Sequence, residues 1–201
     1  REDLGLPEEG FVFCCFNNTY KITPTTFDGW GRILEQVEGS VLLIYADNES
    51  AQINLKKEIA LRGIDPSRLI FGKHLPKPEY LARYQVADLF LDTCPHNAGT
   101  TASDALRMGL PVLTFIGNSF VSREAASVIN AVNLSELITT TKEEYESLAI
   151  ELATNPEKLK IIKDKLVYNL SSSPLYDTLL FTKHLESAYL TMYERYQQGL
   201  E

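Results

Sequence analysis

The fold is decided by the stretch Asp92-Thr93-Cys94-Pro95-His96-Asn97-Ala98-Gly99-Thr100-Thr101-Ala102-Ser103-Asp104-Ala105-Leu106. It begins at the end of an apolar run that is typical of a buried strand, passes through a loop of small residues, and enters a helix at Thr100 and Thr101. The first amides of a helix lack partners within the helix, and together with the helix dipole they attract negative charge. The stretch therefore predicts an anion site, and we expect it to hold a diphosphate.

Composition limits the class of protein. The chain has 201 residues, 44% of them hydrophobic and 23% charged, which is enough for one large domain with a full core. A net charge of −8, with no cluster of lysines and arginines among aromatics, argues against nucleic-acid binding. No run approaches the roughly 18 consecutive apolar residues of a membrane span, and no secretion signal opens the chain. We therefore expect no nucleic-acid partner and no membrane association.

The three cysteines favour a reducing compartment. Cys14, Cys15 and Cys94 have no metal-ligand spacing, and an odd count argues against a disulfide framework. Cys14 and Cys15 lie inside a strand-like run, where core packing is the expected role. These features predict a cytoplasmic protein.

Strands and helices alternate along most of the chain. Strands are predicted at residues 11–16, 41–46, 68–71, 86–92, 111–116 and 136–139, and helices at 24–37, 49–62, 77–85, 100–108 and 122–131. This alternation predicts an α/β, Rossmann-like fold, a parallel sheet with right-handed crossovers and helices on both faces. In such sheets ligands bind beyond the carboxyl ends of the strands.

The two ends of the chain differ from this pattern. Residues 1–10 read as a linker, and the chain begins like the middle of a longer protein, so we expect a fragment that forms a single lobe over residues 1–201. Residues 141–201 form a helical C-terminal part, with predicted helices at 142–154, 156–170 and 182–198. The last helix carries the apolar stripe Leu185, Tyr189, Met192 and Tyr196, which we expect to pack back onto the fold.

Three polar loops follow strand ends and should converge, namely residues 17–21, 74–80 and 94–101. Lys21 is able to neutralise a phosphate, although a solvated surface lysine is the plainer interpretation of the residue alone. Thr100 and Thr101 suit phosphate binding and simple helix capping equally well. Asp104, one turn later, either accepts hydrogen bonds from ribose hydroxyls or simply interacts favourably with the positive end of the helix dipole.

Several common sites are missing from the sequence. It lacks Gly-x-Gly-x-x-Gly after the first strand, the P-loop pattern and Gly-x-Ser-x-Gly, which argues against dehydrogenases, P-loop NTPases and α/β-hydrolases. His74 and His96 read as loop histidines and His184 as a partly buried packing residue. No histidine pair and no Asp-x-Asp stands at metal-binding spacing, so we predict neither a metal nor a cofactor.

Four separated motifs in register carry a family resemblance. They are Phe13-Cys14-Cys15-Phe16-Asn17-Asn18-Thr19-Tyr20-Lys21-Ile22-Thr23-Pro24, Asp88-Leu89-Phe90-Leu91-Asp92-Thr93, Asn97-Ala98-Gly99-Thr100-Thr101-Ala102-Ser103-Asp104-Ala105-Leu106 and Gly109-Leu110-Pro111-Val112-Leu113-Thr114. From about residue 10 to 200 the chain resembles the C-terminal catalytic half of the O-linked N-acetylglucosamine transferase and SPINDLY family.

The resemblance implies one lobe of a two-lobed GT-B glycosyltransferase, the lobe that binds the nucleotide-sugar donor. It implies metal-independent, inverting O-glycosylation of protein serine or threonine. The donor would be UDP-N-acetylglucosamine or, as in relatives named SPINDLY, GDP-fucose. Upstream tetratricopeptide repeats and an acceptor-side lobe outside this chain would present the protein acceptor.

The resemblance also implies roles at the phosphate end of the donor. Lys21 resembles the lysine that meets the diphosphate and stabilises the leaving group, and Asn18 resembles a neighbouring polar contact. Thr100 and Thr101 match the phosphate-binding threonines. Gly99 stands where the animal transferases carry a histidine, so a side-chain contact to the donor is absent here.

At the nucleoside end, Lys77 and Arg83 match basic positions of the family. Tyr80 falls where the animal enzymes have a base-stacking histidine, and Asp104 matches the ribose-binding acid. Three alternatives remain open: a non-catalytic nucleotide-sugar-binding or regulatory module, a GT-B-like sugar-nucleotide epimerase, or a plain interaction domain that uses its helical C-terminus.

Overall fold

The computed structural model describes residues 1–200. They fold around a six-stranded parallel sheet with the strand order β3-β2-β1-β4-β5-β6. The strands are β1 (Val12–Cys15), β2 (Val41–Tyr45), β3 (Leu69–Gly72), β4 (Leu89–Leu91), β5 (Val112–Phe115) and β6 (Ile138–Thr139). The order reverses between the neighbours β1 and β4, where loops that leave the sheet in opposite directions open a crevice.

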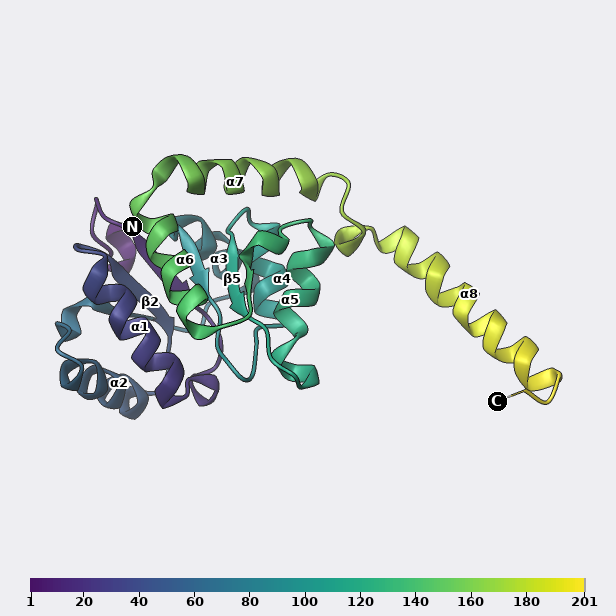
Figure 1. The fold of residues 1–201 in the computed structure, drawn as a ribbon, viewed down its shortest axis with the longest axis horizontal. Coiled ribbons are helices and arrows are strands. Elements are labelled where there is room, and N and C mark those ends of the chain that lie inside the picture. Colours follow the sequence, from purple (N-terminus) through teal and green to yellow (C-terminus); the bar gives the residue numbers. More distant parts are fainter. Residues whose placement is uncertain (201) are drawn as a thin grey trace.

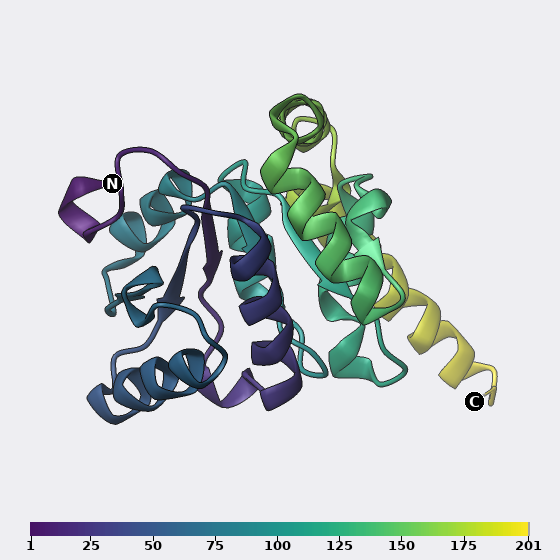
Figure 2. The same ribbon diagram turned by 60° about the vertical axis from the view of Figure 1, so that its left-hand side comes forward.

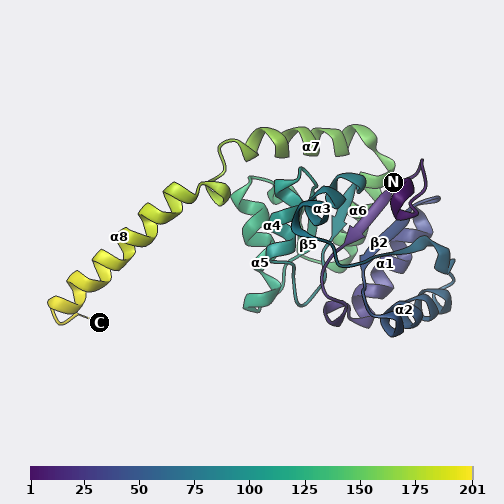
Figure 3. The ribbon, with the colours of Figure 1, turned by 180° about the vertical axis from the view of Figure 1, so that it is seen from behind.

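Helices cover both faces, as right-handed crossovers require. They are α1 (Pro24–Gln36), α2 (Glu49–Leu61), α3 (Lys77–Ala82), α4 (Thr100–Arg107), α5 (Glu124–Ala131), α6 (Lys142–Thr154), α7 (Pro156–Leu170) and α8 (Thr178–Gln197). α1, α2 and α6 lie on the face seen in Figure 1, and α3, α4 and α5 lie on the face seen in Figure 3. The predicted Rossmann-like lobe and its helical C-terminus are confirmed.

The core is a continuous apolar layer between these helices and the sheet. All four residues of β1 are buried, including Cys14 and Cys15, so the prediction of core cysteines is confirmed. The Nε1 of the buried Trp30 donates to Tyr145 Oη at 3.2 Å, and Tyr145 Oη donates to the backbone oxygen of Asp92 at 3.1 Å. This chain of hydrogen bonds joins α1 and α6 to the carboxyl end of β4.

Two of the boundaries that differ from the predictions have clear local reasons. β4 is shorter than residues 86–92, because Arg83–Val86 forms a 3-10 helix that continues from α3. The carboxylate of Asp88 then accepts from the backbone N of Val12 at 3.0 Å. α8 begins earlier than predicted because Asp177 caps it, its Oδ1 accepting from the backbone N of Leu180 at 2.9 Å.

Residues 1–10, for which a linker is predicted, lie against the sheet. Glu2–Leu4 forms a 3-10 helix, and Leu6 is buried in the core. The guanidinium of Arg1 pairs with Asp88 at 2.9 Å.

The prediction that α8 packs back onto the fold is wrong. The helix runs away from the body in two views (Figures 1 and 2), and none of its residues is buried. Leu185 is 40% exposed and Tyr196 is 77% exposed. His184 is also exposed, which corrects its prediction as a packing residue. The helix leaves the body directly after Asp177, so its stripe meets no other part of residues 1–200.

No helix in residues 1–200 is both long and apolar enough to cross a membrane.

The hydrogen-bond chain through Tyr145 gives the first prediction. Tyr145→Phe removes the acceptor of the buried Trp30 Nε1 and the donor to the Asp92 carbonyl, so we expect the free energy of unfolding to fall by about 1–3 kcal/mol. Urea unfolding measures this change. The matched control is Tyr193→Phe on exposed α8, which should leave the urea midpoint unchanged. Equal midpoints for both variants would contradict the role given to Tyr145.

Candidate functional site

A buried carboxylate shapes the loop between β4 and α4. Asp92, which follows β4, is 3% exposed. Its Oδ1 accepts from the backbone N of Thr93 at 2.8 Å and of Ala98 at 2.7 Å, and from Asn17 Nδ2 at 3.2 Å. Its Oδ2 accepts from Thr114 Oγ1 at 2.7 Å. One side chain therefore fixes the loop to the end of β1 and to β5.

The charge of this carboxylate is sensitive to burial. Desolvation raises the pKa of Asp92 to about 7, although the donors from Thr114, Ala98, Thr93 and Asn17 favour the ionised form and lower it. Desolvation outweighs the four donors because the group has no access to water.

The loop delivers a helix N-terminus that no side chain caps. Gly99 is the N-cap residue of α4 and offers no side-chain acceptor. Thr101 Oγ1, in the first turn, donates to Asn17 Oδ1 at 2.5 Å, and Asn17 Nδ2 donates in turn to Thr93 Oγ1 at 2.8 Å. The first amides of α4 therefore stay available to an anion, while Asn17 holds the helix start against the end of β1.

Lys21 reaches the same loop from the other side of the crevice. It lies in the 3-10 helix Thr19–Lys21 after β1, and its Nζ donates to the backbone oxygen of Asn97 at 2.9 Å. Asn18 is exposed, and its side chain makes no hydrogen bond to any residue from 1 to 200. The ammonium group, not the amide, is the side chain that the structure brings to the loop.

A pocket of about 410 Å³ opens beside the start of α4, and we call it the α3–α4 pocket. Its lining comes from the ends of β1 and β2, from the segment that follows β3 and from the first turns of α4. It consists of Phe16, Tyr45, His74, Leu75, Pro76, Lys77, Tyr80, Arg83, Thr100, Thr101 and Asp104. Segments that follow the four neighbouring strands β1 to β4 therefore meet here, as the parallel topology requires.

Arg83 forms the floor of this pocket and is almost fully buried. Its guanidinium stands 4.1 Å from the ring centre of Phe16 and 5.5 Å from that of Tyr80, and one nitrogen donates to the backbone oxygen of Lys73 at 2.8 Å. Its Nε has no hydrogen-bond partner in the described part of the chain. Burial lowers the pKa of Arg83. A Cβ on Gly72 would stand 2.6 Å from a terminal nitrogen of this guanidinium, so a side chain there would require Arg83 to shift.

Tyr80 lies between basic groups at the mouth of the same pocket. Its hydroxyl hydrogen-bonds that of Tyr84, and burial raises the pKa of Tyr80 to about 12. Lys77 Nζ stands 4.9 Å from the Tyr80 ring centre and pairs with Asp104 Oδ2 at 2.7 Å. The carboxylate predicted to bind ribose thus holds a lysine in this structure.

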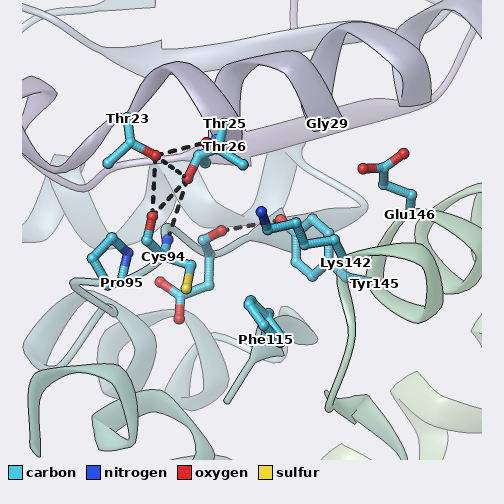
Figure 4. Close-up of a pocket in the computed structure, with 11 residues that line it drawn as sticks. Thr23, Thr25, Thr26, Gly29, Cys94, Pro95, Phe115, Lys142, Tyr145 and Glu146 are labelled. Atoms are coloured by element: carbon cyan, nitrogen blue, oxygen red, sulfur yellow. Dashed lines mark hydrogen bonds between the residues drawn. The ribbon is translucent and has the colours of Figure 1, made fainter. Parts of the chain in front are cut away.

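A second pocket, of about 320 Å³, lies between α1 and α6, on the other side of the β4–α4 loop (Figure 4). Thr23 Oγ1 and Thr26 Oγ1 both donate to the backbone oxygen of Cys94, at 3.2 Å and 2.8 Å. The Cys94–Pro95 peptide that follows is cis. Since these hydroxyls are committed to the loop, the arrangement fixes the loop from behind.

The structure thus gathers most of the predicted residues in one place. The α3–α4 pocket contains Lys77, Tyr80, Arg83, Thr100, Thr101 and Asp104. Gly99 lies on the adjoining loop and Lys21 donates to it from the 3-10 helix after β1, whereas the exposed Asn18 side chain makes no hydrogen bond within residues 1–200. No role was predicted for Asn17 or for the Asp92 side chain. The available signal was that each is a polar residue directly after a buried strand.

Comparison with known proteins points to one family. Residues 1–185 match Glycosyl transferase family 41. The chain is 36% identical over 200 residues to the UDP-N-acetylglucosamine–peptide N-acetylglucosaminyltransferase of Caenorhabditis elegans, covering 100% of this chain and 17% of that protein. It is 33% identical over 195 residues to the probable transferase SPINDLY of Petunia hybrida, covering 94% of this chain and 21% of that protein.

A solved structure agrees with these relatives. An O-GlcNAc transferase mutant of Thermobaculum terrenum superposes with a TM-score of 0.90 at 32% identity, covering 96% of this chain and 38% of that one. The chain spans only about a fifth of the length of the two curated relatives.

The Asp92 network predicts a contrast between two substitutions. Asp92→Ala leaves the donors from Thr93, Ala98 and Asn17 without an acceptor, so we expect a loss of about 3 kcal/mol or more in unfolding free energy. Asp92→Asn keeps one acceptor oxygen, and the Thr114 hydroxyl is able to rotate and accept from the new amide, so the expected loss is below about 1.5 kcal/mol. Urea unfolding at pH 6 compares the two. Equal losses would contradict the network.

The raised pKa of Asp92 also predicts a pH dependence. The group has a pKa of about 3.9 in the unfolded chain and about 7 in the folded one, so the folded state alone holds its proton between those values. Its stabilising contribution is complete below about pH 4 and is lost as pH rises through 7, at on the order of 1 kcal/mol per pH unit. Asp92→Asn should gain stability relative to wild type from pH 5 to pH 8. A constant difference across this range would contradict the raised pKa.

Proposed function

The chain belongs to Glycosyl transferase family 41, and on that premise we propose that it is the donor-binding lobe of a protein O-glycosyltransferase. The donor we favour is UDP-N-acetylglucosamine, because a relative at 36% identity carries that sugar nucleotide in its name. GDP-fucose is the alternative donor. The acceptor we propose is a protein serine or threonine, presented by parts of a longer protein outside these residues.

One observation carries the proposal: an uncapped helix N-terminus and a lysine ammonium meet at a single loop. The first amides of α4 face the crevice beside the α3–α4 pocket, and Lys21 Nζ stands 2.9 Å from the Asn97 oxygen in the same loop. A diphosphate placed there would receive backbone donors on one side and a point charge on the other.

The chemistry of glycosyl transfer uses this arrangement directly. As the acceptor hydroxyl attacks the anomeric carbon, the bond to the leaving diphosphate breaks and negative charge grows on that group. Donors already aimed at this charge stabilise the transition state more than the ground state. Lys21 and the amides of Thr100 and Thr101 are the groups we propose for this task.

The nucleoside would occupy the α3–α4 pocket. The Tyr80 ring offers an aromatic face to the base, and the buried Arg83 supplies a cation and unused donor capacity beneath it. For Asp104 to accept from the ribose hydroxyls, its ion pair with Lys77 must open or be shared with the ligand. Lys77 is then freed to approach the nucleoside.

Nucleotide titration tests this function. We expect UDP or GDP to bind the whole chain with heat in calorimetry and to raise its melting temperature. Lys21→Ala should weaken that binding about tenfold or more, because it removes the ammonium beside the phosphates, and Thr101→Ala should weaken it less. Lys57→Ala, at an exposed position on α2, is the charge-matched control and should leave the affinity unchanged. A folded chain that binds neither nucleotide would contradict the proposal.

A second measurement concerns turnover. The base that takes the proton of the acceptor hydroxyl is proposed to lie outside these residues, so residues 1–201 should bind donor without transferring sugar. A protein acceptor incubated with the chain and a labelled donor tests this. Steady incorporation of label by the purified chain would overturn the assignment as a donor lobe alone.

A further inference from the structure

Glu124 is a carboxylate whose position the site described so far does not explain. It is the first residue of α5 and is partly buried. Its side chain has no hydrogen bond and no ion pair anywhere in residues 1–200. An acidic side chain in the first turn of a helix interacts favourably with the positive end of the helix dipole. This explains why an acid occurs at this position, but it does not explain which neighbouring group the carboxylate faces.

What it faces is the N-cap of α4. A Cβ built on Gly99 would lie 3.4 Å from Glu124 Oε1 and 3.8 Å from Oε2. Because Gly99 has no side chain, the carboxylate comes within contact distance of the loop that precedes the free amides of α4. Both residues line one open hollow of about 840 Å³, which reaches the start of α4 at Gly99 and shares no lining residue with the α3–α4 pocket.

The segment that carries Glu124 is firmly placed. The backbone N of Asn97 donates to the Val121 oxygen at 2.9 Å, which ties this segment to the β4–α4 loop. The backbone N of Gly117 donates to the Ser122 oxygen at 2.9 Å, and a Cβ on Gly117 would collide with Ser122 Oγ at 2.5 Å. These bonds hold the backbone before α5 next to the β4–α4 loop, so Glu124 starts its helix beside Gly99.

We infer that Glu124 determines specificity at the sugar end of the donor, favouring a sugar-linked diphosphate over the free nucleoside diphosphate. The inference rests on the proposed function, because it places the diphosphate at the start of α4. With the nucleoside in the α3–α4 pocket, the group attached to the far phosphate extends past Gly99 into the hollow that Glu124 lines. Sugar hydroxyls are donors, and a carboxylate without a partner is a pure acceptor for them.

The same carboxylate opposes the product. In a nucleotide sugar the far phosphate is esterified, whereas in the free nucleoside diphosphate it is terminal and has a second pKa of about 6. The product therefore carries about one more negative charge at neutral pH, next to Glu124. Attraction for the sugar and repulsion of the extra charge act in one direction, since both favour the substrate over the spent leaving group.

Calorimetry on the whole chain tests this inference with four probes: UDP, UDP-N-acetylglucosamine, GDP and GDP-fucose. The measured quantity is the ratio of the dissociation constant for the free diphosphate to that for its sugar conjugate. In Glu124→Ala we expect this ratio to fall about tenfold, with tighter binding of the diphosphate and weaker binding of the conjugate. Glu124→Gln should tighten binding of the diphosphate likewise while keeping part of the affinity for the sugar.

The matched control is Glu143→Gln, the same charge change at an exposed site on α6, which should leave the ratio as in wild type. A ratio that stays within twofold of wild type in both Glu124 variants, with melting temperatures intact, would overturn the role of Glu124 and leave the donor lobe standing. Failure of the wild-type chain to bind any of the four probes would overturn the proposed function and this inference together.

Discussion

The buried carboxylate of Asp92 is the constraint on which the rest of the site depends. It stands at the carboxyl end of β4, next to the point where the strand order reverses, and accepts hydrogen bonds from Asn17 after β1, from its own loop and from Thr114 in β5. A buried carboxylate of this kind is stable only when donors surround it. The loop must therefore fold around it, and this folding leaves the helix N-terminus facing the crevice without a cap.

The two ends of the proposed donor are bound by different kinds of chemical group. At the phosphate end the groups are backbone amides and Lys21, which the chain positions through a loop fixed on both sides by hydrogen bonds. At the nucleoside end the groups are large side chains packed on one another, with a guanidinium buried between the rings of Phe16 and Tyr80. The first end suits charge and the second suits a flat, weakly polar ring. The unpaired Glu124 adds a third surface, which accepts hydrogen bonds and repels negative charge.

The sequence was sufficient to predict the sheet, the helices with clear caps and the convergence of the three loops. These features follow from hydrophobic periodicity and from parallel topology. Asn17 and Asp92 were missed as organising residues because a polar residue after a strand looks like a turn residue until its partners, far away in sequence, are known. Glu124 was missed for the same reason, since its proximity to Gly99 brings together the starts of α5 and α4, which are far apart in sequence. The apolar stripe on α8 led to a wrong prediction, because an apolar helix face does not indicate which surface it packs against.

The central claim is that a diphosphate binds at the first amides of α4, and amide NMR tests it most directly. Titration of the isotope-labelled chain with UDP or GDP should shift the backbone N–H signals of Thr100, Thr101 and Ala102 in one saturable process, together with that of Lys21. The account predicts that these shifts are among the largest in the chain and follow the calorimetric affinity. Saturable binding that leaves these amides unmoved and shifts another surface would contradict it.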